Sequence, residues 1–587
     1  MSDARRAGVT TTGTDDAPVP RGLVVVAAGG MLLLALVLRH YGLDLVDEGT
    51  LLAQTERVRT GQWPYRDFHT GYGPASFALN ASLLTLFGVH IEVVRIGLAV
   101  THAIALAALT VLAARALGAL AAATVLALTV SFFLPIAPGL FAVWNIPYPS
   151  WYAQAIAAIG LLAALTTDRR GAVALLASGI CMGVAFCFKQ NTGVLGLAGV
   201  LVWRAFERSA PEGRGSPVLG IALAVAVAAG GVAIVAAGLA PEGLGPTGTF
   251  AIALPVLVLA WRVALLRPSG TLWADAAWLT AGFAAVVVPL VLGLVWAVGV
   301  APLARQLLHV GSGAASIYGA PYPGASELAS AIAAASSGWR GMRKAMDVGW
   351  LFVLPAGQLI AVLRLRSYAR TPTWRLLVPS AVLFYVQLYP RADLWHLLPM
   401  AGLSVVVALG ALLHELSNAG ATGRRLAVPV LGMLMVVAAV RWVPNVGDVR
   451  AALSTRPPSP PAVERAAIRW DLASSPALRA VPDVVHAVAG APQLVGFPAL
   501  SVFNFLAGIP SPLRHDYFFP RLLSDAEEQA IAAELERVPQ ARIVVLHDSL
   551  AFFSEAFASH AVIAAAIERD FARVRQVGPY EVREAAP

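Results

Sequence analysis

The sequence has little charge for its length. Only 13% of its 587 residues are charged, whereas 58% are hydrophobic and the mean hydropathy is +0.71. A soluble domain carries roughly 25% charged residues. Leu, Ala and Val gather in runs of about twenty residues, the length of a helix that crosses a bilayer. Because every backbone amide in lipid must be satisfied within its own segment, these runs predict a polytopic helical membrane protein.

Cysteine and lysine are also scarce. The two cysteines, Cys181 and Cys187, lie in one apolar run, at a spacing that suits neither a metal site nor a disulfide framework. The 42 basic residues include only two lysines, Lys189 and Lys344. The arginines stand in small groups between apolar runs, as the positive-inside rule requires. Despite the net charge of +8, this scatter argues against a nucleic-acid partner.

The apolar runs predict about thirteen spans. They fall near residues 22–39, 94–114, 119–137, 151–167, 171–188, 192–206, 217–238, 250–266, 276–299, 348–363, 376–389, 396–413 and 426–443. With a cytoplasmic N-terminus, each predicted inner connection carries arginine. An odd number of spans then places the C-terminus outside the cytoplasm.

Composition divides the chain into three regions. Residues 1–21 are polar and predict a disordered cytoplasmic tail, and residues 22–443 predict the transmembrane domain, with a first outer loop at 40–92. From residue 444 to 587, Pro, Arg, Asp and Glu rise and the long apolar runs stop. This change predicts a small α/β domain outside the cytoplasm.

Short patterns predict the elements of that last domain. Residues 541–546 read as a buried strand, and residues 524–537 and 561–575 as amphipathic helices, with Ser524 at a helix start.

Lys189 is a first candidate for function. It follows the fifth predicted span directly, with Gln190 and Asn191 after it, at or just above membrane depth. An ionisable residue there is costly and usually functional, and a lysine is a compact charge suited to a phosphate oxygen. The alternative is a lysine that extends to the lipid headgroups.

Asp47 and Glu48 lie just beyond the outer end of the first span. One interpretation is a general base held at the membrane surface, within reach of a lipid-borne substrate. The other is a helix cap, since Asp is a favoured N-cap residue and a helix is expected to start near Thr50. The two roles are compatible.

Two further groups of charge lie in outer loops. Arg391, Asp393 and His396 follow the eleventh span, where Arg391 could clamp a phosphate and Asp393 orient it. His396 fits an interfacial residue better than a catalyst. In the loop near 300–347, Arg340 and Lys344 belong to a basic cluster that faces lipid headgroups or a sugar-lipid phosphate.

These residues give the chain a resemblance to membrane glycosyltransferases of the GT-C fold. It resembles in particular the family 39-like branch of protein O-mannosyltransferases and lipid A aminoarabinose transferases. The resemblance rests on five motifs: Asp47-Glu48, the G-x-x-P-Y-R-D-F of residues 61–68, Gly73-Pro74, residues 183–193 and Pro390-Arg391.

The resemblance implies an inverting transfer from a polyprenyl-phosphate sugar, with Asp47 as the base on an acceptor hydroxyl. Glu48 would support Asp47 or bind the acceptor, and Lys189 and Arg391 would offset charge on the departing phosphate. Arg66 and Asp67, in the Y-R-D-F motif, could also contact substrate. Asp67 is a candidate metal ligand, but further outer acids are lacking, so we expect no cofactor.

A transporter or flippase of lipid-linked sugars is the main alternative, and a non-catalytic scaffold is another. A transporter favours an internal repeat with polar residues near the midplane, whereas here the polar groups gather at the outer face. The acceptor is a glycan, a lipid or a protein. Aromatic residues from Trp144 to Tyr152 fit either sugar stacking or an interfacial belt. The composition favours a bacterial plasma membrane.

Overall fold

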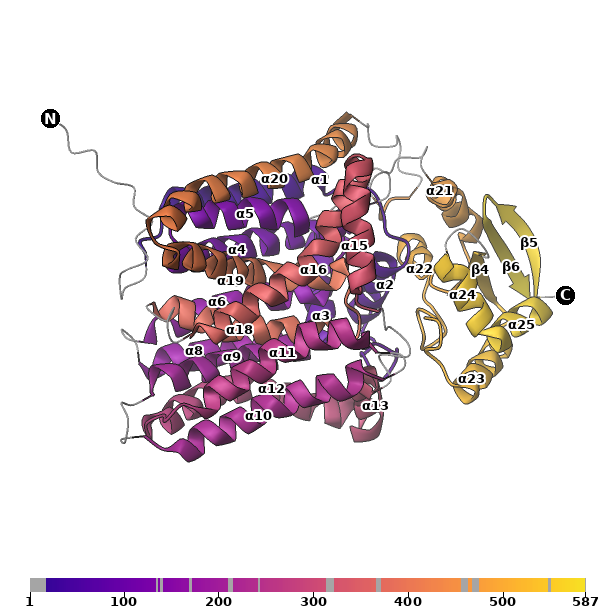
Figure 1. Cartoon of the computed structure of the whole chain (residues 1–587). Coiled ribbons are helices and arrows are strands. Elements are labelled where there is room, and N and C mark those ends of the chain that lie inside the picture. Colours follow the sequence, from indigo (N-terminus) through magenta and orange to yellow (C-terminus); the bar gives the residue numbers. More distant parts are fainter. Residues whose placement is uncertain are drawn as a thin grey trace.

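In the computed structural model the chain forms a bundle of long helices, with a small α/β domain at one end of the bundle (Figure 1). This end is named the domain face. The structure describes residues 17–133, 136–137, 141–167, 171–209, 215–240, 243–312, 321–365, 371–454, 463–466, 475–546 and 551–585.

The first half of the bundle begins with α1 and with two short helices in the predicted first outer loop. The elements are α1 (Arg21–Leu38), α2 (Asp47–Arg59), α3 (Pro74–Phe87), α4 (Ile91–Leu117), α5 (Ala119–Phe133), β1 (Ile136–Ala137), β2 (Phe141–Ala142), η1 (Val143–Asn145), α6 (Pro149–Ala164), α8 (Ala172–Phe188) and α9 (Gln190–Glu207). Gly118 separates α4 from α5 with φ +84°, a backbone conformation that favours glycine.

The second half of the bundle includes two short helices near the domain face, α13 and α15. Its elements are α10 (Pro217–Gly238), α11 (Gly245–Ala264), α12 (Thr271–Val298), α13 (Val300–Ser312), α15 (Ala325–Ala334), η2 (Ala335–Ser337), α16 (Trp339–Leu363), α18 (Pro372–Tyr385), η3 (Val386–Leu388), α19 (Leu394–Asn418) and α20 (Gly420–Ser454).

The helical membrane architecture is confirmed, but the number of spans is not. Each of the thirteen predicted spans overlaps a helix. Among the described residues, eight helices are long and apolar enough to cross a bilayer: α1, α4, α10, α11, α12, α16, α19 and α20. The other five predicted spans fall on α5, α6, α8, α9 and α18. The 14 residues of α18 reach about 21 Å, short of a hydrocarbon core of about 30 Å.

The C-terminal domain is a four-stranded sheet between helices, as the sequence predicted. The elements are α21 (Pro476–Val488), β3 (Gln493–Phe497), α22 (Val502–Ala507), α23 (Asp525–Glu536), β4 (Ala541–Leu546), α24 (Ala551–Ser559), α25 (Ala561–Asp570), β5 (Phe571–Val577) and β6 (Tyr580–Ala585). The strand order is β3-β4-β6-β5, with β3 and β4 parallel and the other pairs antiparallel.

Residues of β4 alternate between the two faces of this sheet. Val544 and Leu546 join the core that contains α21 and α22, whereas Ile543 and Val545 join the core that contains α23 and α25. Because both faces of the sheet are covered, β4 is buried along nearly its whole length, which is why a short continuous apolar run predicted this strand correctly. The helix predicted for 524–537 is also confirmed as α23, which Ser524 caps.

The helix predicted over 561–575 was wrong in its last third. The helix α25 ends at Asp570, and the next residues form β5, an edge strand that pairs with β6. Phe571 and Val577 at the two ends of β5 are buried, while the residues between them are exposed. An edge strand that is exposed to solvent shows little apolar periodicity. Its sequence therefore resembles the polar end of a helix.

Candidate functional site

The helix α2 starts at the domain face, and its first turn is capped from outside the helix. One carboxylate oxygen of Asp44 accepts hydrogen bonds from the backbone N–H groups of Val46, Asp47 and Glu48, at 3.1, 2.5 and 3.2 Å. Burial and the nearby Asp47 carboxylate raise the pKa of Asp44 to about 7. The capping role considered for Asp47 therefore belongs to Asp44.

Asp47 is half-buried, and its carboxylate accepts a hydrogen bond from the phenol of Tyr148, the residue that precedes α6. Burial and the Asp47 charge raise the pKa of Tyr148 well above its usual value, so the phenol remains a proton donor. The structure thus holds Asp47 from two sides: its backbone by Asp44 and its carboxylate by Tyr148.

Glu48 has a different environment from its neighbour. It is fully buried, and both of its carboxylate oxygens pair with Arg95 of α4 at 2.8 Å. The same guanidinium donates to the backbone carbonyls of Arg39 and Gly42, at 2.7 and 2.8 Å. Of the two roles expected for Glu48, this geometry favours support of the loop between α1 and α2 over contact with substrate.

Lys189 is the single residue between α8 and α9. Its backbone is extended, with φ −148°, and its side chain is half-buried. This corner packs against the start of α3: a Cβ on Gly73 would lie 2.3 Å from the carbonyl oxygen of Cys187 and 2.5 Å from that of Phe188. A glycine is therefore required at position 73 for the Lys189 corner to lie beside the first outer loop.

The helix α6 connects this corner to Asp47. Tyr152, one turn after Tyr148, stacks on Phe188 with ring centroids 5.3 Å apart. Its hydroxyl also donates to Asn80 of α3, at 2.9 Å. Asp47 and the residue before Lys189 thus contact successive turns of one helix, and both predicted residues belong to one region.

The loop before α19 adds the Arg391 group. Asp393 caps α19 by accepting from the His396 N–H at 3.0 Å, and it pairs with Arg391 at 2.5 Å and with the His396 ring at 2.8 Å. Burial would raise the pKa of Asp393, but the His396 hydrogen bond and the nearby cations lower it to about 2. Asp393 therefore orients Arg391, and His396 is engaged by Asp393.

A hydrogen bond across the bundle links this loop to Lys189. Thr192, three residues after Lys189, donates to the side-chain oxygen of Gln387 at 2.7 Å. Gln387 lies in η3, four residues before Arg391. The structure therefore places Lys189 and Arg391 on connected segments of the bundle.

The side chains of the remaining predicted residues contribute less to this region, although the backbone carbonyl of Asp67 accepts from Arg57 of α2 at 3.0 Å. Arg66 and Asp67 pair with each other at 2.8 Å, and Asp67 also accepts from the backbone of Trp63, so together they close a turn. Gln190 and Asn191 begin α9, half-buried and exposed respectively. Lys344 is exposed on α16, and the side chain of Arg340 lies outside the described residues.

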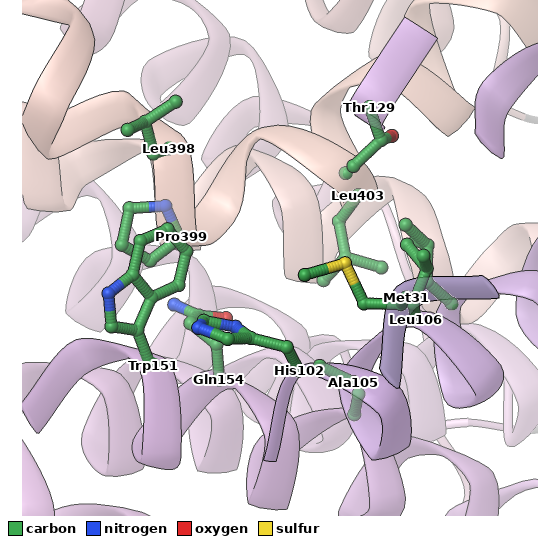
Figure 2. A pocket seen from close by; sticks show the side chains of 13 residues that line it. Met31, His102, Ala105, Leu106, Thr129, Trp151, Gln154, Leu398, Pro399 and Leu403 are labelled. Carbon is green, nitrogen blue, oxygen red and sulfur yellow. The ribbon is translucent and has the colours of Figure 1, made fainter. Parts of the chain in front are cut away.

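A cavity of about 90 Å³ lies within the bundle, between α1, α4, α5, α6 and α19. Trp151 and Gln154 line it, one turn and nearly two turns after Tyr148, and Figure 2 shows them grouped with His102. Met31 and Leu403 line a more apolar part. The cavity therefore begins one helical turn from the residue that holds Asp47.

Sequence reasoning missed Asp44, Arg95 and Gln387 as parts of this region. Arg95 had a detectable signal, because it is the only charged residue inside the predicted span 94–114 and such residues are usually functional or paired. Asp44 stands three residues before Asp47. This is the usual spacing between a capping side chain and a backbone N–H from which it accepts a hydrogen bond. Gln387 had no signal, since its partner is far away in sequence.

No family model matches the chain, and no curated protein matches it. Among solved structures, ArnT from Cupriavidus metallidurans bound to undecaprenyl phosphate is similar, with a TM-score of 0.51 and 14% identity over 97% of this chain and 99% of that chain. The archaeal oligosaccharyltransferase AglB from Archaeoglobus fulgidus, in complex with an inhibitory peptide and a dolichol-phosphate, gives 0.47 and 10% identity, covering 96% and 74%. The likeness to ArnT shows the GT-C fold expected from the sequence.

Proposed function

We propose that this GT-C chain is a glycosyltransferase that moves a sugar from a polyprenyl phosphate to an acceptor hydroxyl at the domain face. The main support for this proposal is the position of the Asp47 carboxylate. It accepts a hydrogen bond from Tyr148, while Asp44 caps the start of α2. A half-buried carboxylate fixed at the membrane boundary is suited to act as a general base.

Each step of the transfer has a residue for its task. Asp47 takes the proton of the acceptor hydroxyl, and the acceptor oxygen attacks the anomeric carbon from the side opposite the phosphate. The bond between that carbon and the phosphate oxygen breaks, and the electron pair leaves with the lipid phosphate, so the anomeric configuration inverts. Lys189 and Arg391 offset the negative charge on the phosphate, an electrostatic contribution often worth several kcal/mol.

The nature of the donor is supported by the fold and by the cavity. ArnT shares the fold, and the ligand in its structure is undecaprenyl phosphate. In this chain the cavity lined by Trp151 begins one turn into α6 from Tyr148, and we propose that it takes part of the hydrocarbon of a lipid donor whose phosphate is near Lys189. A sugar on such a lipid stays at the bilayer surface, so its catalyst must work there.

The transfer is proposed to be independent of metal. Asp67, the candidate second ligand, is occupied by Arg66 and by the Trp63 N–H, and Asp44 already accepts three backbone N–H groups. The described residues hold no group of three His, Cys, Asp or Glu side chains that could bind a metal ion. A chelator added to the assay should therefore leave the rate unchanged.

A reconstituted assay separates transfer from translocation. Purified chain in liposomes is supplied with a panel of polyprenyl-phosphate sugars and with glycan, lipid and protein acceptors. The proposal expects free polyprenyl phosphate and glycosylated acceptor in equal amounts, both lost in Lys189→Ala. Movement of intact lipid-linked sugar between leaflets, with no release of polyprenyl phosphate, would instead identify a flippase.

We propose that this reaction takes place at the extracytoplasmic face of the plasma membrane. The arginines of the predicted inner connections favour an orientation in which the domain face lies outside the cytoplasm.

A further inference from the structure

We infer that the C-terminal domain is a fixed part of the catalytic site, because its helix α22 holds the helix that carries Asp47. The inference rests on the proposed function and assigns a role to the C-terminal domain within it. Figure 1 shows α22 beside α2, at the point where the α/β domain meets the bundle.

The contact between α2 and α22 is close. A Cβ on Gly49 would lie 2.5 Å from the Cβ of Val502 and 3.0 Å from its Cα, so the first turn of α2 touches α22 through a glycine. One residue further along, the hydroxyl of Ser501 lies 3.2 Å from that of Thr50. Gly49 is two residues from Asp47, so any displacement of α22 acts on the turn that carries the base.

A buried ion pair fixes the other end of α2. Arg57 pairs with Asp516 of the C-terminal domain at 2.7 Å, and the same nitrogen donates to the Leu513 carbonyl at 2.9 Å. Burial raises the pKa of Asp516, against the opposite effect of Arg57. Because each buried charge needs its partner in place, the pair gives the contact between α2 and the C-terminal domain a defined geometry.

The two parts also share one hydrophobic core. Leu52 of α2 and Val94 of α4 lie in the same buried cluster as Phe503 and Leu506 of α22 and Tyr580 of β6. The core of the C-terminal domain is therefore completed by the bundle. Through Glu48 and Asp47, α2 also contacts Arg95 and Tyr148 of the bundle. The helix α2 is therefore held between the bundle and α22.

Gly49→Ala tests whether this contact positions the base. The added methyl group would push α22 away, and we expect kcat to fall at least tenfold. The KM for the donor should change less than twofold, because Lys189 and Arg391 lie on other elements. Gly49→Ala/Val502→Gly should recover part of the lost kcat. Gly230→Ala is the matched control, since a Cβ there meets nothing within 4 Å.

A reversible cross-link tests the same idea without new bulk. In the chain carrying Cys181→Ala and Cys187→Ala, the pair Thr50→Cys and Ser501→Cys places two thiols where the native hydroxyls lie 3.2 Å apart, and oxidation is used to join them. We expect the oxidised, cross-linked chain to keep at least half of the reduced rate.

Two results would overturn the inference: an unchanged kcat in Gly49→Ala, or a cross-linked chain at least tenfold slower that recovers with reductant. The second result would mean that α22 must leave α2 during turnover. If the native chain transfers no sugar to any acceptor, the proposed function itself fails, which is a different outcome from either of these.

Discussion

Three carboxylates lie within five positions at the start of α2, and each has a different partner. Asp44 accepts backbone N–H groups, Asp47 accepts the Tyr148 phenol, and Glu48 pairs with Arg95. Because the two flanking acids satisfy the backbone and the buried arginine, the Asp47 carboxylate accepts instead from a neutral donor, the Tyr148 phenol. This distribution supports a catalytic role for Asp47 alone.

Tyr148→Phe removes the hydrogen bond to Asp47 and keeps the ring. The base then loses the contact that orients its carboxylate, and because a misplacement of about 1 Å can cost about 10²-fold, the transfer rate should fall about tenfold to a hundredfold. Steady-state kinetics with a fixed donor measure the effect. Tyr152→Phe, which removes the hydroxyl one turn further along α6, serves as the matched control. An equal loss in both variants would argue that the Asp47 contact has no special importance.

Asp44→Asn keeps an oxygen to cap α2 and removes the titration. The pKa of Asp44 is raised to about 7 from 3.8, so the folded state binds the proton more tightly than the unfolded state. The stability that this proton contributes is present below about pH 4 and is lost as the pH rises through about 7. One unit of pKa shift corresponds to about 1.4 kcal/mol.

Thermal unfolding in detergent at pH 4, 5.5 and 7.5 checks this expectation. The unfolding temperature of the native chain should fall with rising pH relative to that of Asp44→Asn. Parallel pH curves for the two chains would show that Asp44 titrates normally.

At the scale of elements, the site is built from helix ends rather than helix faces. Asp47 begins α2, Tyr148 precedes α6, Lys189 separates α8 from α9, and Asp393 caps α19. Helix ends leave backbone groups unpaired, and the ends of a helix that spans a bilayer are expected near its surface. Charged residues can gather there without burial in lipid, which explains why the predicted functional residues concentrate between spans.

The capping and orienting roles of Asp393 can be separated by two substitutions. Asp393→Asn retains an N-cap oxygen but loses the ion pair with Arg391, so we expect a raised KM for the donor at nearly native stability. Asp393→Ala should raise the KM similarly and also lose about 1 kcal/mol of stability with the cap. Donor titrations and thermal unfolding of both variants distinguish the roles. A native KM in Asp393→Asn would contradict the orienting role.

At the scale of the whole molecule, the sequence predicted the helical bundle and the small C-terminal α/β domain, which the structure has. Hydropathy carries this information because each long helix must satisfy its own backbone in lipid. The side of the membrane on which that domain lies and the roles of Asp47 and Lys189 stay predictions. The number of spans stays a prediction, because length and hydropathy do not decide whether short apolar helices such as α18 cross the bilayer. Contacts across the chain, such as Thr192 with Gln387 or Gly49 with Val502, leave no local pattern.

The arginine pattern also predicts the orientation of the whole molecule, with the C-terminal domain outside the cytoplasm. In a variant of the chain that lacks Cys181 and Cys187, Val574→Cys on the exposed strand β5 should react with a membrane-impermeant maleimide in intact cells. Ala119→Cys, exposed at the start of α5 and next to a predicted inner connection, should react only after the membrane is opened. The reverse pattern of labelling would invert the proposed topology.

The most direct test of the central claim is single-turnover transfer by Asp47→Asn, compared with the native chain and with Asp67→Asn. The donor is the polyprenyl-phosphate sugar that the native chain uses. Loss of a general base should reduce the rate by about 10²–10⁴-fold. We predict this loss in Asp47→Asn with donor binding retained, and near-native transfer in Asp67→Asn. Native transfer by Asp47→Asn would show that Asp47 is not the base.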